Sequence, residues 1–305
     1  MSLSMIFKGE ILEDKRDKLE KRVLVGIDDS EVSLKVAGYV AKMFVRDPMF
    51  NASLIYVLPA LPTVLFEEEH KLDKYQRAYK KKLESKYQGQ VEEIFRKVKK
   101  VFLKVGWAEG RLETITAPRH FSLSKELLFF AEHGYYDALA LGWQDMSGIE
   151  RIFKSSTGEE VLYSPKNVPL WLIADDLISS SVLVAIDGSE SAMRAVDHAG
   201  FVLSGRKDIE FILFHVVSGQ EEAASIFNRA ESILTKAGIP KSQIKKVAYQ
   251  GKNIAEAILA YKKANQISTV IMGRRGISKM KALFWGSVSS KVLKETKGGA
   301  VWIVD

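Results

Sequence analysis

Two patterns of hydrophobic residues alternate along this chain. Continuous apolar runs of about five residues, typical of strands buried on both faces, are followed by stretches in which apolar residues recur every three or four positions, as in helices. The run 23–27 and the helical pattern through Val36, Val40 and Phe44 form the first such pair, and the run 54–58 follows. This alternation predicts open α/β domains built on parallel sheets.

The opening pattern occurs twice. The letters V-L-V-G-I-D, which end at Asp28, return as V-L-V-A-I-D, which end at Asp187. Val57 follows the first aspartate by 29 positions, and Val216 follows the second by the same 29. A repeat of this length and spacing indicates a tandem duplication in which each copy begins with a strand-helix-strand unit.

We therefore expect two domains, 1–178 and 179–305. The first copy is about 28 residues longer, and the excess lies in Phe66–Gly106, a charged segment with helical spacing. An elongated helix packed on its own sheet is the favoured interpretation, and a helical arm that binds a partner is the alternative. The run Lys80–Lys82 is expected to be the solvated side of that helix.

Short stretches of the sequence predict further secondary structure and contacts. The polar stretch Gly9–Lys21 has the spacing of a short surface helix, and Ala300–Val304 is expected to be a last strand at a sheet edge. Trp171 and Trp302 occupy matching positions in the last strands of the two copies, so burial or a contact between copies is expected. Ser189, like its counterpart in the first copy, follows an acidic strand end and is expected to cap the next helix.

Composition narrows the class of protein. Hydrophobic residues make up 47% and charged residues 27%, as in globular proteins with substantial cores. No apolar run reaches the roughly 18 residues of a membrane span. With no cysteine and no secretory pattern at its start, the chain is expected in the cytoplasm. The net charge of +7 comes from 45 basic and 38 acidic residues, a mixture that favours a solvated surface over a nucleic-acid footprint.

One glycine-rich stretch points to a ligand. The strand ending at Ile271 is followed by Gly273, Gly276 and Gly286, and then by Ser287 at the start of a helical pattern. Glycines leave backbone N–H groups uncovered, and a helix start adds free N–H groups and the positive end of its dipole. The stretch therefore predicts an anion site, with phosphate as the expected anion.

Several charged and polar side chains near this stretch have further candidate roles. Arg274 or Arg275 could neutralise phosphate charge directly. The five histidines lack the spacing of metal ligands, and His215, which lies within a strand, is expected to be a satisfied core residue. The chain has no Walker A sequence and no G-x-S-x-G.

Together these residues resemble the ATP-binding branch of the universal stress protein family. The resemblance rests on Ala185-x-Asp187, on Val216, and on the spacing G-x2-G-x9-G-S that begins at Gly273. It covers residues 22–176 and 181–305 and so implies a tandem member. It implies two five-stranded parallel sheets in the order 3-2-1-4-5, packed as an internal pseudo-dimer through their last strands; a homodimer of such chains stays open.

The resemblance also implies roles for individual residues. Ala185 and Val216 would wall an adenine pocket, and Met272 would pack at the base or ribose. Asp187 would face the ribose, or a divalent ion such as Mg²⁺ on the phosphates. The phosphates would lie on the loop and the helix start, against Gly273, Arg275, Gly276, Gly286, Ser287, Val288 and Ser289.

The first copy departs from this pattern. Asp145 and Ser155 stand where the second and third glycines belong, and Glu159 and Glu160 occupy the first helical turn. Acidic side chains there oppose a phosphate and take its place at the helix dipole. We therefore expect no triphosphate in the N-terminal copy.

The sequence thus predicts a stress-response regulator that binds ATP, ADP or AMP in its C-terminal half. The nucleotide would order the loop 273–289, and an unidentified protein partner would bind the ordered form. A slow ATPase or nucleotide-dependent transferase, and a nucleotide-free scaffold, are the alternatives. Nucleic-acid binding ranks below them because it rests on charge alone.

Overall fold

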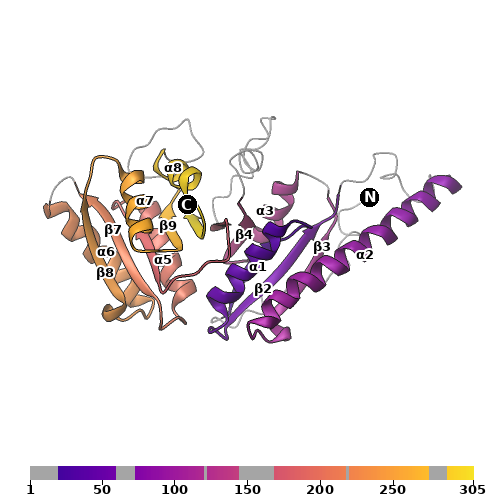
Figure 1. Cartoon of the computed structure of the whole chain (residues 1–305), viewed down its shortest axis with the longest axis horizontal. Coiled ribbons are helices and arrows are strands. Elements are labelled where there is room, and N and C mark those ends of the chain that lie inside the picture. The colour runs from indigo at the N-terminus through magenta and orange to yellow at the C-terminus, as the bar shows by residue number, and fades with distance from the viewer. Residues whose placement is uncertain (1–19, 60–72, 120–121, 144–167, 218–219, 275–286) are drawn as a thin grey trace.

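The computed structural model describes residues 20–59, 73–119, 122–143, 168–217, 220–274 and 287–305. Strands and helices alternate along the chain as the sequence predicts (Figure 1). The first half contains β1 (Lys21–Gly26), α1 (Glu31–Phe44), β2 (Phe50–Val57), α2 (Lys74–Lys104), β3 (Leu112–Ala117), α3 (Leu123–His133), β4 (Ala138–Gly142) and β5 (Leu170–Ile173). The second contains β6 (Ser181–Ala185), α5 (Glu190–Leu203), β7 (Glu210–Val217), α6 (Gln220–Lys236), β8 (Ile244–Gln250), α7 (Ile254–Ala264), β9 (Thr269–Gly273), α8 (Ser287–Glu295) and β10 (Ala300–Val304).

The strands of the described residues form one sheet in the order β3-β2-β1-β4-β5-β10-β9-β6-β7-β8. Neighbouring strands are parallel except β5 and β10, which are antiparallel. Each half is therefore a five-stranded parallel sheet in the order 3-2-1-4-5, which confirms the expected fold class. Because β10 pairs with β5, it lies in the middle of the sheet, and the expectation that the last strand is an edge was wrong.

Helices cover both faces of the sheet, which explains the continuous apolar runs. One face packs against α1, α2, α5 and α6, and the other against α3, α7 and α8. Along β1, Val23 and Val25 belong to the first core, whereas Leu24 between them belongs to the second. Successive side chains of a strand point to opposite faces, so a strand covered on both sides must be apolar at every position.

The two halves meet through a buried aromatic stack. Trp171 of β5 and Trp302 of β10 are register partners, and their ring centroids are 4.2 Å apart. Trp171 Nε1 donates to His198 Nε2 of α5 at 3.0 Å, and the hydroxyls of Tyr39 and Thr269 are 2.8 Å apart. The expected packing through the last strands is thus observed, and the matched tryptophans are buried as expected.

The long helix α2 has a packed part and an unpacked part. Val91, Val98 and Phe102 are buried, and they bring the second half of the helix onto its own domain, where it contacts α1 and β3. The favoured interpretation of this segment is confirmed for that part. The first half extends past the end of the sheet (Figure 1).

The N-terminal surface helix expected over Gly9–Lys21 was wrong at its end. Lys21 is the first residue of β1 and is buried, because Asp47 and the end of α5 supply polar partners for its ammonium group. Residues 1–19 lie outside the described part of the chain. Among the described helices, none combines the length and the apolar composition that a bilayer crossing requires.

Candidate functional site

The predicted site lies at the carboxyl ends of the central strands of the second half. Strand β6 runs between β7 and β9, so the chain connections leave it in opposite directions. Ala185 ends β6 and Gly273 ends β9, and Ala185 is the register partner of Met272. Ligands of open α/β sheets bind where the strand order reverses in this way.

Four predicted apolar residues lie near the carboxyl ends of three neighbouring strands or at the start of α8 and belong to one core. Met272 is buried in the core on the α7 and α8 face of the sheet, and Ala185, Val216 and Val288 are partly buried against the same core. Val288 reaches it because α8 begins one residue earlier, at Ser287. The structure therefore brings together side chains that are separated by more than 100 positions in the sequence.

A tight turn places Asp187 beside these residues. Gly188 has φ +83°, a conformation that side chains disfavour. The turn lets Ser189 cap α5, where its hydroxyl accepts from Ala192 N at 3.2 Å, as expected from the sequence. Ser189 N donates to Asp187 Oδ1 at 3.0 Å, so the carboxylate is held at the helix start.

Gly273 is required by close packing. A Cβ built on it would lie 2.5 Å from Ser191 Oγ and 2.8 Å from Ala192 N, because α5 crosses the strand end there. Gly142 meets the same constraint in the first half, where a Cβ would lie 2.3 Å from a methyl group of Val32. The glycine at the strand end is therefore explained by packing in both halves, whether or not a phosphate binds.

Two other predicted residues make contacts within the protein. The Arg274 guanidinium is buried and forms an ion pair with Asp305, with N and O 2.9 Å apart. Ser289 Oγ donates to the Arg274 carbonyl at 3.0 Å, which fastens the start of the loop to α8. The Arg274 guanidinium thus pairs with the carboxylate of Asp305. Arg275, Gly276 and Gly286 lie outside the described residues.

The N-terminal copy differs in the part of it that the structure describes. Asp28 accepts hydrogen bonds from the hydroxyls of Ser30 and Ser33, the latter at 2.6 Å. Burial tends to raise the pKa of Asp28, but the bonds from Ser30 and Ser33 outweigh it and lower the pKa below its ordinary value. The second copy has Ala192 at the position of Ser33. The positions of Asp145, Ser155, Glu159 and Glu160 lie outside the described residues.

Two neighbours of the site were missed from the sequence. Tyr249 of β8 is the register partner of Val216 and packs on the same core, so its ring lies beside the predicted apolar wall. Ser33 binds the Asp28 carboxylate in the other half. Tyr249 could have been found from the alternation of β8, and Ser33 from its replacement by alanine in the second copy.

Two expectations about histidine and metals can be compared with the structure. His215 is buried, and its Nδ1 lies 2.8 Å from the Ile186 carbonyl, so it is a satisfied core residue as expected. Within the described ranges, no three His, Cys, Asp or Glu side chains are grouped as metal ligands.

Comparison with known proteins identifies the family. The sequence model described as the Universal stress protein family matches residues 20–168 and 179–304. Universal stress protein Slr1230 of Synechocystis is 29% identical over 118 residues, which are 38% of this chain and 40% of that protein. The match thus spans two fifths of the length of this curated relative.

A solved structure of nearly the same length shares the fold, and a shorter one matches part of the chain. A universal stress protein from Archaeoglobus fulgidus has 24% identity and a TM-score of 0.61, covering 93% of this chain and 96% of its own. A universal stress protein solved in complex with cAMP has 25% identity and a TM-score of 0.35, covering 41% of this chain and 95% of its own. With two family matches in tandem and a fold shared along nearly its whole length, this chain belongs to the universal stress protein family.

Proposed function

We propose that the C-terminal half binds an adenine nucleotide, ATP, ADP or AMP, and that the protein acts as a nucleotide-dependent regulator in the cytoplasm. The observation that carries the proposal is the convergence of Ala185, Val216, Met272 and Val288 beside Asp187. An apolar wall next to one carboxylate suits a flat base attached to a sugar, because the base buries its faces and the sugar offers hydroxyl donors.

The phosphates would extend toward α8. Its first residue, Ser287, is exposed, and the helix start offers N–H groups and a positive dipole end to an anion. Asp187 would accept from the ribose, or it would supply one oxygen to a Mg²⁺ ion held mainly by the phosphates. Mg²⁺ in nucleotide sites commonly takes only one or two protein carboxylates, so a single aspartate fits this role.

The N-terminal half would remain without nucleotide. Its Asp28 carboxylate already accepts two serine hydroxyls and the amide of Ser30 at 3.0 Å. A ribose would have to displace these bonds. These hydrogen bonds are a second reason to expect no nucleotide in the N-terminal half, besides the acidic residues at 145, 159 and 160.

Two matched variants test the proposal. Asp187→Asn and Asp28→Asn make the same chemical change at equivalent positions of the two halves. Calorimetric titration with ATP and with AMP should give one site per chain, weakened at least tenfold by Asp187→Asn and unchanged by Asp28→Asn. Loss of binding in Asp28→Asn with normal binding in Asp187→Asn would place the nucleotide in the other half and end the proposal.

Two further measurements identify the nucleotide and its effect. Mass analysis of the small molecule that co-purifies with the wild type, but not with Gly276→Asp, would name the nucleotide. Gly276→Asp imports the residue of the first copy. Hydrogen exchange across 273–289 should slow when nucleotide saturates the protein, and unchanged exchange would exclude regulation by ordering of this loop.

Release of phosphate from ATP separates binding from catalysis. A binding protein should release none above the buffer blank. Steady-state release that is lost in Asp187→Ala would favour the slow ATPase instead.

A further inference from the structure

Against the part of the chain that the structure describes, the first half of α2 packs no face. None of the described side chains from Asp73 to Gln90 is buried, and Tyr75 is 85% and Tyr79 53% exposed. The first buried residue of the helix is Val91. In Figure 1 these turns extend past the sheet, away from the second half of the chain. We call Lys74–Gln90 the arm.

The arm carries a concentrated positive charge. It has one acidic residue, Glu84, and six basic ones: Lys74, Arg77, Lys80, Lys81, Lys82 and Lys86. None of the six forms an ion pair with a described residue, whereas Arg96 and Lys97, further along the same helix, both pair with Glu93. The near balance of charge over the whole chain therefore conceals a strongly basic segment.

The sequence of the arm opposes its own helix. Its first turn contains no acidic residue and places Lys74 and Arg77 at the positive end of the helix dipole. Arg77 with Lys81, and Lys82 with Lys86, are like-charge pairs four residues apart, a spacing that brings them together on a helix. A capping box between Asp73 and Gln76 supports the helix start. An anionic partner would remove the repulsion that remains.

The distribution of charge around the arm distinguishes between anionic partners. At 3.6 residues per turn the six basic side chains span roughly two thirds of the circumference, and the remaining third carries Tyr79, Leu83 and Tyr87. A helix that lies on a membrane needs a broad face of Trp, Phe and Leu, which this arm lacks. An acidic protein surface would contact one side and leave the other basic residues in solvent.

The major groove of duplex DNA matches the arm on both counts. The groove is about 12 Å wide, it admits an α-helix, and it has phosphates along both rims. Seventeen residues make a rod of about 25 Å. The major groove of A-form RNA is too narrow for such a rod. Tyrosine hydroxyls, like lysine and arginine side chains, bind phosphate oxygens in protein–DNA complexes.

We propose that the arm inserts into the major groove of duplex DNA and binds its phosphates without preference for base sequence. Phosphate contacts carry no direct information about bases, and the arm has no Asn and only Gln76, Gln88 and Gln90 as amide side chains for base edges. This activity is separate from the nucleotide site, which lies in the other half of the chain.

The test measures DNA binding by the full chain. A fluorescent duplex of about 20 base pairs of mixed sequence is titrated between about 50 and 200 mM KCl, where binding through phosphates weakens steeply. The arm variant is K81Q/K82Q/K86Q. The control is K207Q/K245Q/K263Q, which removes the same charge from exposed, scattered lysines of the second half.

The arm variant should bind at least tenfold more weakly. Its slope of log affinity against log salt should be shallower by about 2.7, since each lost phosphate contact removes about 0.9. The control should stay within twofold of the wild type. K81R/K82R/K86R should restore binding, because it keeps the charge while changing the same positions.

Several results would overturn the proposal. They are absence of wild-type binding at the lowest salt, equal losses in the arm and control variants, and a preference for duplex RNA or for vesicles containing anionic lipid over DNA. Circular dichroism of each variant verifies that the exposed substitutions leave the helix content unchanged.

Discussion

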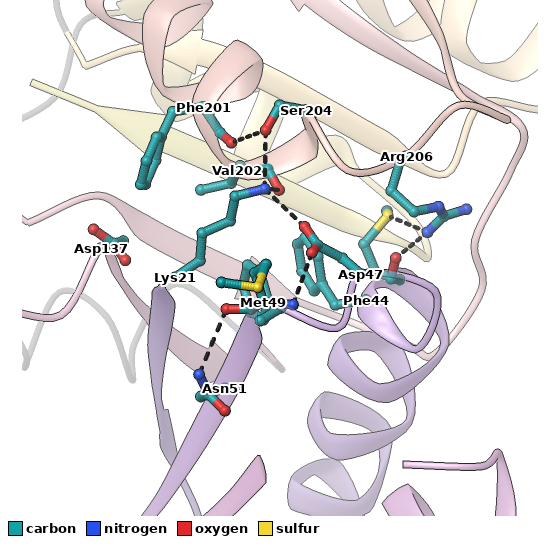
Figure 2. A network of polar contacts seen from close by, with 12 residues as sticks. Lys21, Phe44, Asp47, Met49, Asn51, Asp137, Phe201, Val202, Ser204 and Arg206 are labelled. Atoms are coloured by element: carbon teal, nitrogen blue, oxygen red, sulfur yellow. Dashed lines mark hydrogen bonds and ion pairs between the residues drawn. The ribbon is translucent and has the colours of Figure 1, made fainter. Parts of the chain in front are cut away.

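The buried ion pair between Lys21 and Asp47 gives a quantitative prediction about how the two halves are held together. Lys21 Nζ lies 2.7 Å from Asp47 Oδ2, and the side chains are 7% and 3% exposed. The same ammonium group donates to Ser204 Oγ at 3.0 Å and faces the Val202 carbonyl, both at the end of α5 in the other half (Figure 2). The Lys21 ammonium therefore pairs with Asp47 in its own half and links the start of β1 to the second half through α5.

Removal of the lysine should be severe. In Lys21→Met the Asp47 carboxylate stays buried and loses its ion-pair partner, keeping the amide of Met49 at 3.1 Å and the charge of nearby Arg111. Breaking a buried pair from one side costs about 3–5 kcal/mol of unfolding free energy, since an uncompensated charge is left behind. Lys21→Met combined with Asp47→Leu should cost less than the two single changes together, because no charge is then left without its partner.

An exposed ion pair that does join the two halves provides the control. Arg46 and Asp208 are also 2.7 Å apart, but their side chains are 69% and 38% exposed. Asp208 keeps Arg206 as a partner when Arg46 is removed. Arg46→Met should therefore cost less than about 1 kcal/mol.

Urea unfolding at neutral pH, followed by tryptophan fluorescence and circular dichroism, measures these differences as shifts of the midpoint at constant slope. If Lys21→Met costs no more than Arg46→Met, burial does not set the strength of this pair and the reasoning fails. The same conclusion would follow if the double variant lost the full sum of the two single changes.

Three further predictions follow from single positions. Burial lowers the pKa of His198 from 6.5 to about 3, so His198 stays neutral in the folded protein while it gains a proton in the unfolded chain. The unfolding free energy should therefore fall by at most about 5 kcal/mol as the pH drops from 6.5 to 3. In His198→Gln, whose side chain can still accept from Trp171, the urea midpoint should change less over the same pH range. Gly299 has φ +76°, and a Cβ on it would lie 1.9 Å from the Ser268 carbonyl oxygen. Gly299→Ala should therefore lower the unfolding free energy by about 3 kcal/mol or more. A thermal midpoint equal to that of the wild type would contradict this backbone conformation. Gly89 lies in α2 with no atom within 4 Å of an added Cβ, so Gly89→Ala should stabilise the helix by about 0.5–1 kcal/mol, seen as slower amide exchange in the arm.

Features encoded by short stretches of sequence were predictable. Apolar runs such as the one at Val182 gave the strands, because a strand covered on both faces must be apolar at each position. Ser30 and Ser189 were recognised as helix caps from the residue type and its place after a strand. The repeated spacing from Asp28 and Asp187 predicted the duplication, and the family resemblance implied the order of strands in each half.

Sites assembled from distant residues were only partly predictable. The apolar wall at Ala185 and Val216 was expected from the resemblance, but Tyr249 beside it was not. Arg274 gave no sign in the sequence that it pairs with Asp305, since the pairing depends on β9 and β10 running in parallel register.

What the sequence by itself determined is the content of each half: which segments are strands, which are helices, and that the pattern occurs twice. Only the tertiary structure decided that β10 pairs with β5 in antiparallel register, that Lys21 is buried beside Asp47, and that no described side chain in the first half of α2 is buried. The physical reason is that periodicity and capping act over a few neighbouring residues. Strand pairing and burial of a charge depend on groups that are distant in the sequence, 26 positions away for Lys21 and Asp47 and more than a hundred for β5 and β10, and these leave no local pattern.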